Sequence, residues 1–368
     1  MNEYRAAANK VSDSLKGLSE LIANGKQRVE LAFLNLLDSE INISTDLRSE
    51  ASVSQKRIRD IITTENSRDS TFPAILKIQD NDFLGGSFAR HTKISPLDDI
   101  DVYFPIDGAT LTFTDSEKSF LVISDGILNN PMSDAKWDKG SGKISSKKLV
   151  AGFADLLKTR YPNSQVRADG QAVTIRLSSI AVGSQKDPGL GFDVVPCFLI
   201  RPSDSVQENF YVIADGKDDW VRTNPRVDQD IGELIHNVHN KTFRPVVKLI
   251  KYWNTKYFQD KIKSYFIELV IAKAYIEKGA GVKIGSIQEG LVLGFEAVSS
   301  SVNSKLSQSS WVKKAPPVDA GDTITDVDRL NLYLKSLAAS KAWKTYNNLE
   351  FTKAIEEWSE LFPELANG

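Results

Sequence analysis

The chain is poor in the residue types that form disulfides and zinc sites. Its 368 residues include one cysteine, Cys197, and three histidines. A single cysteine excludes an intrachain disulfide and a cysteine-based structural zinc site, and this composition fits a reducing compartment. No histidine adjoins Cys197 in the sequence, so we expect a buried structural thiol rather than a nucleophile.

Long apolar runs and an excess of one charge sign are also missing. The run from Phe266 to Ala274 is interrupted by Glu268 and Lys273, far short of the roughly 20 apolar residues that cross a membrane. The N-terminal segment carries scattered charges where a signal peptide has an apolar core. The net charge is −2, so no overall field attracts membranes or long nucleic acids. We expect a cytoplasmic protein whose anion sites are local.

Hydrophobic periodicity divides the chain into three stretches. Residues 4–66 carry the helical period, residues 82–213 carry short β-rich runs between turn residues, and the helical period returns from residue 226. The predicted strands are 100–104, 172–177, 192–200 and 210–213. The predicted helices after the first stretch are 147–160, 226–239, 243–259, 264–278, 285–299, 326–345 and 350–360. We expect an α+β fold with N-terminal helices and a sheet lobe in residues 1–225 and a helical lobe in residues 226–368.

The segment 83–104 joins a glycine-rich turn to a pair of carboxylates. Gly86 permits a backbone conformation closed to other residues and lets a phosphate approach main-chain N–H groups, while Ser87 adds a hydroxyl donor. Asp99 and Asp101 are two residues apart on a predicted strand, so both side chains point to the same face. Two carboxylates on one face repel each other unless a cation lies between them. The segment therefore predicts a phosphate-binding turn followed by a cation site.

A third carboxylate, Asp193, lies in the strand-like and otherwise apolar segment 191–197. A buried charge in such a segment needs a metal, a partner or solvent. If this strand adjoins that of Asp99 and Asp101, the three carboxylates suit two Mg²⁺ ions and two-metal phosphoryl or nucleotidyl transfer. Taken singly, the features have ordinary explanations: a turn, a solvated carboxylate pair and a half-buried aspartate. Their combination in this order favours the metal site.

These residues also resemble a known signature. Gly86-Ser87, then Asp99-Ile-Asp101, then Asp193 resembles the GS…DxD…D pattern of the nucleotidyltransferase superfamily that includes DNA polymerase β. The flanking sequence resembles the bacterial cGAS/DncV-like nucleotidyltransferases (CD-NTases), most strongly in the motif region and over most of the chain. The resemblance implies a polymerase β-like nucleotidyltransferase lobe with a mixed sheet and a helical C-terminal lobe. It places the active site in the cleft between them.

A second segment, residues 244–263, carries six basic residues and one acidic residue. The simpler explanation of this segment is a solvated basic helix face. For Ser264, the simpler explanation is the N-cap of the following helix. The segment and the Ser-Tyr pair after it resemble cyclic GMP-AMP synthase and its bacterial relatives. The resemblance implies that Lys251 and Ser264 contact the donor triphosphate. It also implies that Tyr265 stacks on a base, a contact that holds a nucleotide without choosing it.

The expected activity follows from this resemblance. It implies a cyclic oligonucleotide synthase that joins nucleoside triphosphates, ATP among them, into a cyclic di- or trinucleotide with release of pyrophosphate. Asp99, Asp101 and Asp193 are the expected catalytic residues and ligands of two Mg²⁺ ions, with Mn²⁺ as an alternative. The resemblance places the product in bacterial anti-phage (CBASS) signalling. Regulatory proteins, including an enzyme that conjugates the C-terminus, are expected partners.

Two alternatives stay open at this point. The same site would serve a nucleotidyltransferase that modifies an RNA 3′ end or a hydroxyl of a protein or small molecule. Against RNA tailing, the chain lacks the net positive charge and basic domain that long phosphate tracking demands. A catalytically silent nucleotide sensor is the second alternative, although all three carboxylates are present. We therefore expect neither a membrane nor a long nucleic acid to be required.

Overall fold

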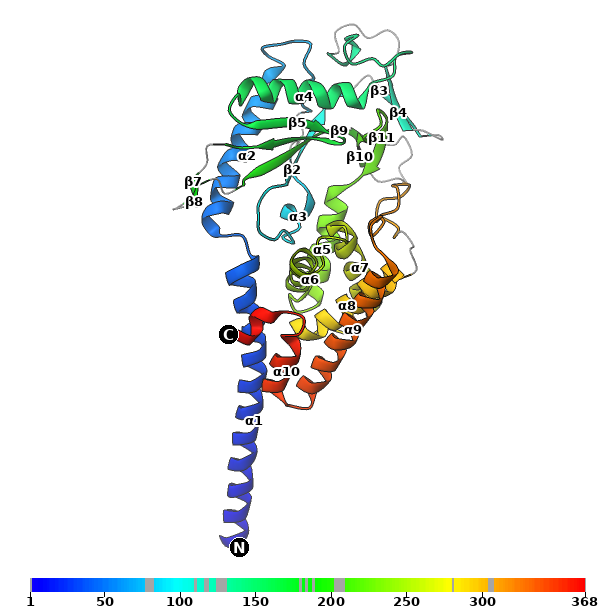
Figure 1. The fold of residues 1–368 in the computed structure, drawn as a ribbon. Helices are drawn as coiled ribbons and strands as arrows, with labels where there is room; N and C mark the ends of the chain where they lie inside the picture. The colour runs from blue at the N-terminus through cyan, green and yellow to red at the C-terminus, as the bar shows by residue number, and fades with distance from the viewer. Residues whose placement is uncertain are drawn as a thin grey trace. The chain divides into compact units, whose positions relative to one another are not determined.

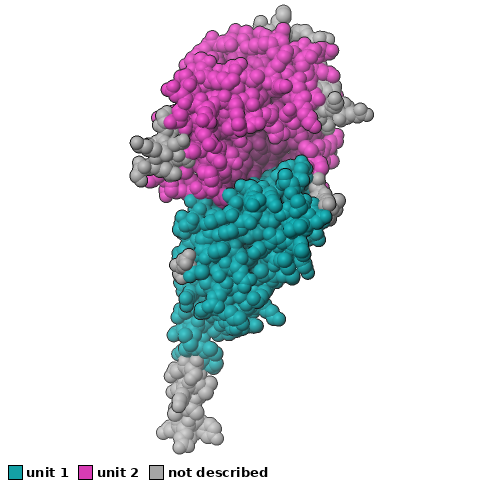
Figure 2. All heavy atoms as spheres, viewed as in Figure 1, with its two compact units in different colours: residues 1–42, 232–308, 318–368 teal, residues 43–231, 309–317 magenta. Residues whose placement is uncertain are grey.

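The computed structural model describes most of the chain, namely residues 2–76, 83–108, 111–115, 119–123, 131–178, 181–182, 185–186, 189–201, 209–279, 281–303 and 308–367. The chain divides into two compact units (Figure 2). Unit 1 comprises residues 1–42, 232–308 and 318–368, and unit 2 comprises residues 43–231 and 309–317.

This division differs from the predicted one at the N-terminus and at residues 309–317, which were predicted in the helical lobe but belong to unit 2. Residues 1–42, predicted in the sheet lobe, cluster with the C-terminal helices. The reason is aromatic packing that periodicity alone does not reveal. Phe33 has ring centroids 5.5 Å from Trp358 and 6.1 Å from Phe362, both edge to face, and all three rings are buried. Such pairs add stability beyond the apolar area that they bury.

Unit 2 is built on a mixed seven-stranded sheet. Its strands are β1 (Phe83–Leu84), β2 (Ile100–Ile106), β5 (Gln165–Asp169), β6 (Ala172–Arg176), β9 (Gly191–Ile200), β10 (Phe210–Ala214) and β11 (Trp220–Thr223). β9 is central: it pairs in parallel with β2, and antiparallel with β6 near its start and with β10 near its end. Two further hairpins are β3 (Leu111–Asp115) with β4 (Ser119–Ile123), and β7 (Ala181–Val182) with β8 (Gln185–Lys186). The four predicted strands are confirmed.

The two faces of this sheet differ in chemistry. Val102 and Phe104 of β2 and Val194 of β9 join the main hydrophobic core. Helix α4 (Ser146–Arg160), which was predicted, contributes to the same core and lies along the sheet (Figure 1). Because side chains alternate along a strand, Asp101 and Asp193 leave the opposite face. The fold therefore fixes two carboxylates on one side by burying their neighbours on the other.

Unit 1 is helical. Its helices are α1 (Asn2–Leu36), α6 (Phe243–Tyr257), α7 (Ser264–Glu277), α8 (Ile287–Asn303), α9 (Asp326–Asn347) and α10 (Phe351–Trp358), followed by the 3₁₀ turn η3 (Pro363–Asn367). The helix α5 (Pro225–Val238) crosses the division between the units, and α2 (Thr45–Glu65) belongs to unit 2. The predicted helices after residue 226 are confirmed with ends shifted by a few residues. No helix in the described ranges is long and apolar enough to span a bilayer.

Candidate functional site

The strands β2 and β9 bring two of the predicted carboxylates together. Asp101 and Asp193 are direct Cα partners in the parallel register of these strands. On its other side, Asp193 is the register partner of Thr174 in β6. The condition set by the sequence, that the strand of Asp193 adjoins that of Asp101, is met.

Burial and like charge act on both carboxylates. Burial, followed by the charges of Asp193 and Asp99, raises the pKa of Asp101 to about 7. Burial also raises the pKa of Asp193, against a hydrogen bond from Thr174 that lowers it. The Oδ1 atom of Asp193 is buried without a hydrogen-bond partner. Two carboxylates that repel each other, one of them with a buried oxygen that lacks a hydrogen-bond partner, have the chemistry that a hard divalent cation such as Mg²⁺ complements.

Asp99 lies just before β2 and has a different setting. Its side chain is 54% exposed and pairs with Lys93, whose Nζ also lies 2.8 Å from Oδ1 of Asp98. The charge of Asp99 still contributes to the raised pKa values of Asp101 and Asp193. Within the described part of the chain, no three histidine, cysteine or acidic side chains are gathered as a metal-binding group. The roles of Asp99, Asp101 and Asp193 as metal ligands therefore stay predictions.

The glycine-serine turn lies directly against this pair of carboxylates. Gly86 has a φ of +58°, in the left-handed region that favours glycine. A Cβ atom built on Gly86 would lie 1.6 Å from Oδ2 of Asp101, so no side chain fits there. The backbone N–H of Gly85 donates to the carbonyl of Asp101 at 2.9 Å, which fastens the turn to β2. The structure thus brings Gly86, Ser87, Asp101 and Asp193 together within unit 2.

The remaining predicted residues lie in unit 1. Lys251 on α6 is buried and forms an ion pair with Glu268 on α7, with 4% and 6% of the two side chains exposed. Ser264 is exposed and Tyr265 is half-buried at the start of α7. The N-cap of α7 is Lys263, so the alternative reading of Ser264 as the cap is wrong.

Sequence reasoning missed the pairing role of Glu268. A signal was available, because Glu268 is an isolated carboxylate in an apolar helical stretch, four residues after Ser264. A buried charge of this kind needs a partner of opposite sign. The pattern predicts that a partner exists, but it does not say which lysine supplies it.

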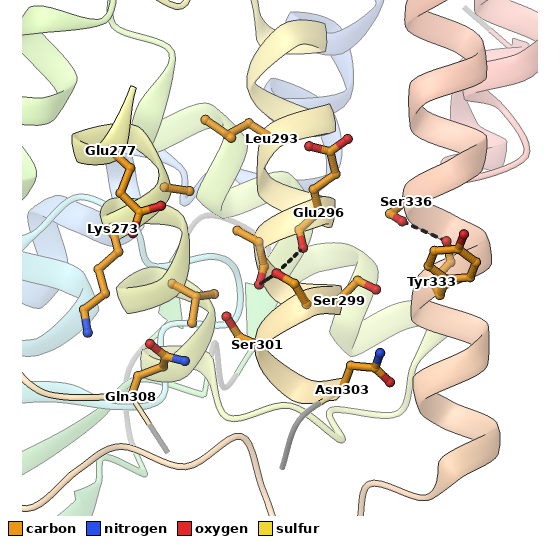
Figure 3. Close-up of a pocket in the computed structure, with 14 residues that line it drawn as sticks. Lys273, Glu277, Leu293, Glu296, Ser299, Ser301, Asn303, Gln308, Tyr333 and Ser336 are labelled. Atoms are coloured by element: carbon orange, nitrogen blue, oxygen red, sulfur yellow. Dashed lines mark hydrogen bonds between the residues drawn. The ribbon is translucent and has the colours of Figure 1, made fainter. Parts of the chain in front are cut away.

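A hollow of about 620 Å³ lies among α7, α8 and α9 (Figure 3). Its polar lining includes Lys273, Glu277, Glu296 and Tyr333, which project from all three helices. None of the predicted site residues lines it. The hollow is a feature of helix packing that the sequence pattern did not predict.

Comparison with known proteins gives consistent relatives. No family model matches the chain. A probable cyclic nucleotide synthase from Bacillus cereus (strain VD146) is 27% identical over 253 residues, which cover 66% of this chain and 70% of that protein. The structure of E. coli MS115-1 CdnC with ATP gives a TM-score of 0.57 at 18% identity, covering 90% of this chain and 97% of that chain. The E. coli MS115-1 CdnC:HORMA-deltaN complex gives 0.58 at 20% identity, covering 90% and 96%.

These findings confirm the predicted α+β fold and agree with the resemblance to the CD-NTases. The chain has the fold of CdnC, which is a CD-NTase, and is similar over two thirds of its length to a protein named as a cyclic nucleotide synthase. The location of an active site in a cleft between two lobes stays a prediction.

Proposed function

We propose that this protein is a nucleotidyltransferase that joins nucleoside triphosphates into a cyclic di- or trinucleotide and releases pyrophosphate. One observation carries the proposal: the register pairing of Asp101 and Asp193 beside the Gly86 turn, where any side chain would meet the Asp101 carboxylate. Such a site gathers negative charge next to backbone suited to a phosphate. The name of the Bacillus relative supports the same reaction.

Asp99, Asp101 and Asp193 would hold two divalent cations. When bound, Mg²⁺ or Mn²⁺ supplies positive charge for the triphosphate and lowers the pKa of a ribose hydroxyl. The hydroxyl oxygen bonds to the α-phosphorus as the bond to pyrophosphate breaks. Asp193 takes the hydroxyl proton, as a carboxylate within reach of the attacking oxygen can.

In this proposal, the residues that the sequence resemblance singles out hold the donor nucleotide. Backbone N–H groups at Gly86 and the Ser87 hydroxyl contact the triphosphate, together with Lys251 and Ser264. Tyr265 stacks on a base. Glu268, which pairs with Lys251, fixes the direction of its amine. ATP is among the donors that we propose, and a structural neighbour is solved with ATP.

The test is synthesis by purified protein. Wild type, D101N and D193N receive all four ribonucleoside triphosphates and Mg²⁺, with pyrophosphate release and mass spectrometry as readouts. D155N is the matched control, because Asp155 is an exposed carboxylate on α4 whose side chain is 75% accessible. We expect D155N to retain synthesis, and D101N and D193N to lose it while staying folded. Wild-type turnover in D101N would sink the proposal.

The alternatives have their own signatures in the same assay. A phosphatase-resistant product formed without any acceptor supports cyclic synthesis. Turnover only after addition of RNA, a protein or a small hydroxyl compound would replace it with transfer to that acceptor. Nucleotide binding without pyrophosphate release would indicate a silent sensor.

We also place the product in bacterial anti-phage (CBASS) signalling in the cytoplasm, with regulatory protein partners. The support is a structural neighbour solved in complex with HORMA-deltaN. An enzyme that conjugates the C-terminus of this protein is a further proposed partner. Phage challenge of cells that carry the D101N protein, compared with D155N, tests the role in defence. Equal protection by both variants would contradict it.

A further inference from the structure

Lys93 connects the glycine-serine turn to the first predicted carboxylate. Its backbone N–H donates to the carbonyl of Ser87 at 3.0 Å, beside a second bond from Thr92 at 2.9 Å. Its side chain pairs with Asp99 and with Asp98, and 12% of that side chain is exposed. The residue is therefore fixed at its backbone by the turn and at its amine by the carboxylates.

The segment that follows Lys93 is held from the other side by β9. The N–H of Gly191 donates to the carbonyl of Leu97 at 3.1 Å. A Cβ atom on Gly191 would lie 2.2 Å from the carbonyl oxygen of Asp98, so the two backbones are in close contact. Gly191 is two residues from Asp193 in the same strand. The Lys93 amine is thus fixed next to Asp99 in the same part of unit 2 as the Asp101–Asp193 pair.

We propose that Lys93 is a positioning residue that competes with a divalent cation for the Asp99 carboxylate and so sets the cation affinity of the site. The inference rests on the proposed function, because it takes Asp99 as a cation ligand. Two positive charges that share one carboxylate repel each other over a few ångströms, in surroundings that screen charge less than water does. The same lysine holds the otherwise exposed Asp99 side chain in place.

Removal of the Lys93 charge then raises the cation affinity, whereas a substitution that only disturbs the structure lowers it or leaves it unchanged. A lysine with only a structural role leaves cation binding unchanged or weaker when it is replaced. A lysine that competes with the cation makes binding tighter when it is replaced. Tighter cation binding is therefore the readout that separates the two roles.

The experiment titrates Mn²⁺ alone into the full-length protein and measures free Mn²⁺ by electron paramagnetic resonance. The variants are K93M, K93Q and K93R, with D193N as a test of the site itself. We expect about tenfold tighter Mn²⁺ binding in K93M and K93Q, wild-type binding in K93R, and weaker binding in D193N. Two neutral variants are used so that a folding defect in one, monitored by circular dichroism, still leaves a measurement.

Other results separate the inference from the proposed function. Unchanged or weaker Mn²⁺ binding in both K93M and K93Q, with binding still weakened in D193N, overturns the role of Lys93 and leaves the proposed function standing. Mn²⁺ binding that D193N leaves unchanged overturns the Asp101–Asp193 site and the inference with it.

Discussion

The two units treat buried charge in opposite ways. In unit 1, Lys251 pairs with Glu268, and Lys261 lies 2.6 Å from Asp328. The hydrogen bond from Lys261, opposed by burial, lowers the pKa of Asp328 to about 2. In unit 2, Asp101 instead faces another carboxylate, and burial raises its pKa to about 7. A buried pair of opposite charge is neutralised within the fold, and loss of one partner leaves the other charge buried alone, whereas like charges held together by a fold indicate a ligand-binding or catalytic role.

The largest expected effect comes from a substitution that crowds the Asp101 carboxylate in unit 2. G86A would place a Cβ atom 1.6 Å from Oδ2 of Asp101 and displace that carboxylate. We expect pyrophosphate release to fall by about 100-fold, since a 1 Å misplacement in a site has effects of this size. G142A is the matched control: Gly142 also has a positive φ of +69°, but nothing lies within 4 Å of a Cβ built there. Equal losses in both variants would show that backbone strain, not contact with Asp101, is responsible.

The next largest effect is expected from removal of Glu268, the ion-pair partner of Lys251 in unit 1. E268A leaves the ammonium group of Lys251 buried without the Glu268 carboxylate. We expect the free energy of unfolding to fall by about 3–5 kcal/mol, measured by urea unfolding. D155N, which breaks the exposed pair of Asp155 with Lys158, should change it by less than about 0.5 kcal/mol. A loss in E268A no larger than in D155N would contradict the role given to the buried pair.

In unit 2, by contrast, the charged form of the Asp101 carboxylate lowers the stability of the fold. The pKa of Asp101 is about 7 in the folded protein and lies near its ordinary value of 3.8 when the chain is unfolded. The unfolded chain therefore releases this proton first, and the stability of the wild type falls as the pH rises from about 4 to about 7. With chelator present, we expect a fall of about 2–4 kcal/mol over this window in wild type, and a much smaller one in D101N. Parallel pH profiles of the two proteins in urea unfolding would contradict this.

The smallest effect concerns Glu364 in η3, which accepts hydrogen bonds from Lys256 at 2.5 Å and from the hydroxyl of Tyr252 at 2.9 Å. Burial raises the pKa of Glu364, but the bonds from Lys256, from the Tyr257 hydroxyl, from a backbone N–H and from Tyr252 outweigh it and lower the pKa to about 2. Its contribution is therefore present above about pH 4.5 and is lost as the pH falls toward about 2. We expect E364Q to cost about 1 kcal/mol at pH 7 and to speed hydrogen exchange in η3. Unchanged exchange in η3 would argue against this anchoring contact.

Much of the fold could be predicted because periodicity reports which face of an element is buried. The alternation around Asp101 and Asp193 identified the strands β2 and β9, and the helical period identified α6 and α7. The sequence also predicted a glycine turn at Gly86, but for the approach of a phosphate; the structure adds that the Asp101 carboxylate lies where a side chain would be.

What escaped prediction depends on contacts between residues far apart in the sequence. The grouping of Phe33 with Trp358 decides to which unit the first helix belongs, and no local pattern encodes it. The pairing of Lys251 with Glu268 and the hold of Lys93 on Asp99 are choices among several lysines of equal charge. A sequence states that a buried charge needs a partner, but only the packed chain selects it.

The register pairing of Asp101 with Asp193 also has a consequence for the lifetime of the protein. A fold that is weakened at its own site gains stability from whatever binds there, by about 2.7 kcal/mol at a ligand concentration 100 times Kd. Under the proposed function, a cell rich in nucleotide and divalent cation would hold fewer unfolded copies for proteases to degrade. The abundance of the protein would then follow the supply of its own substrates.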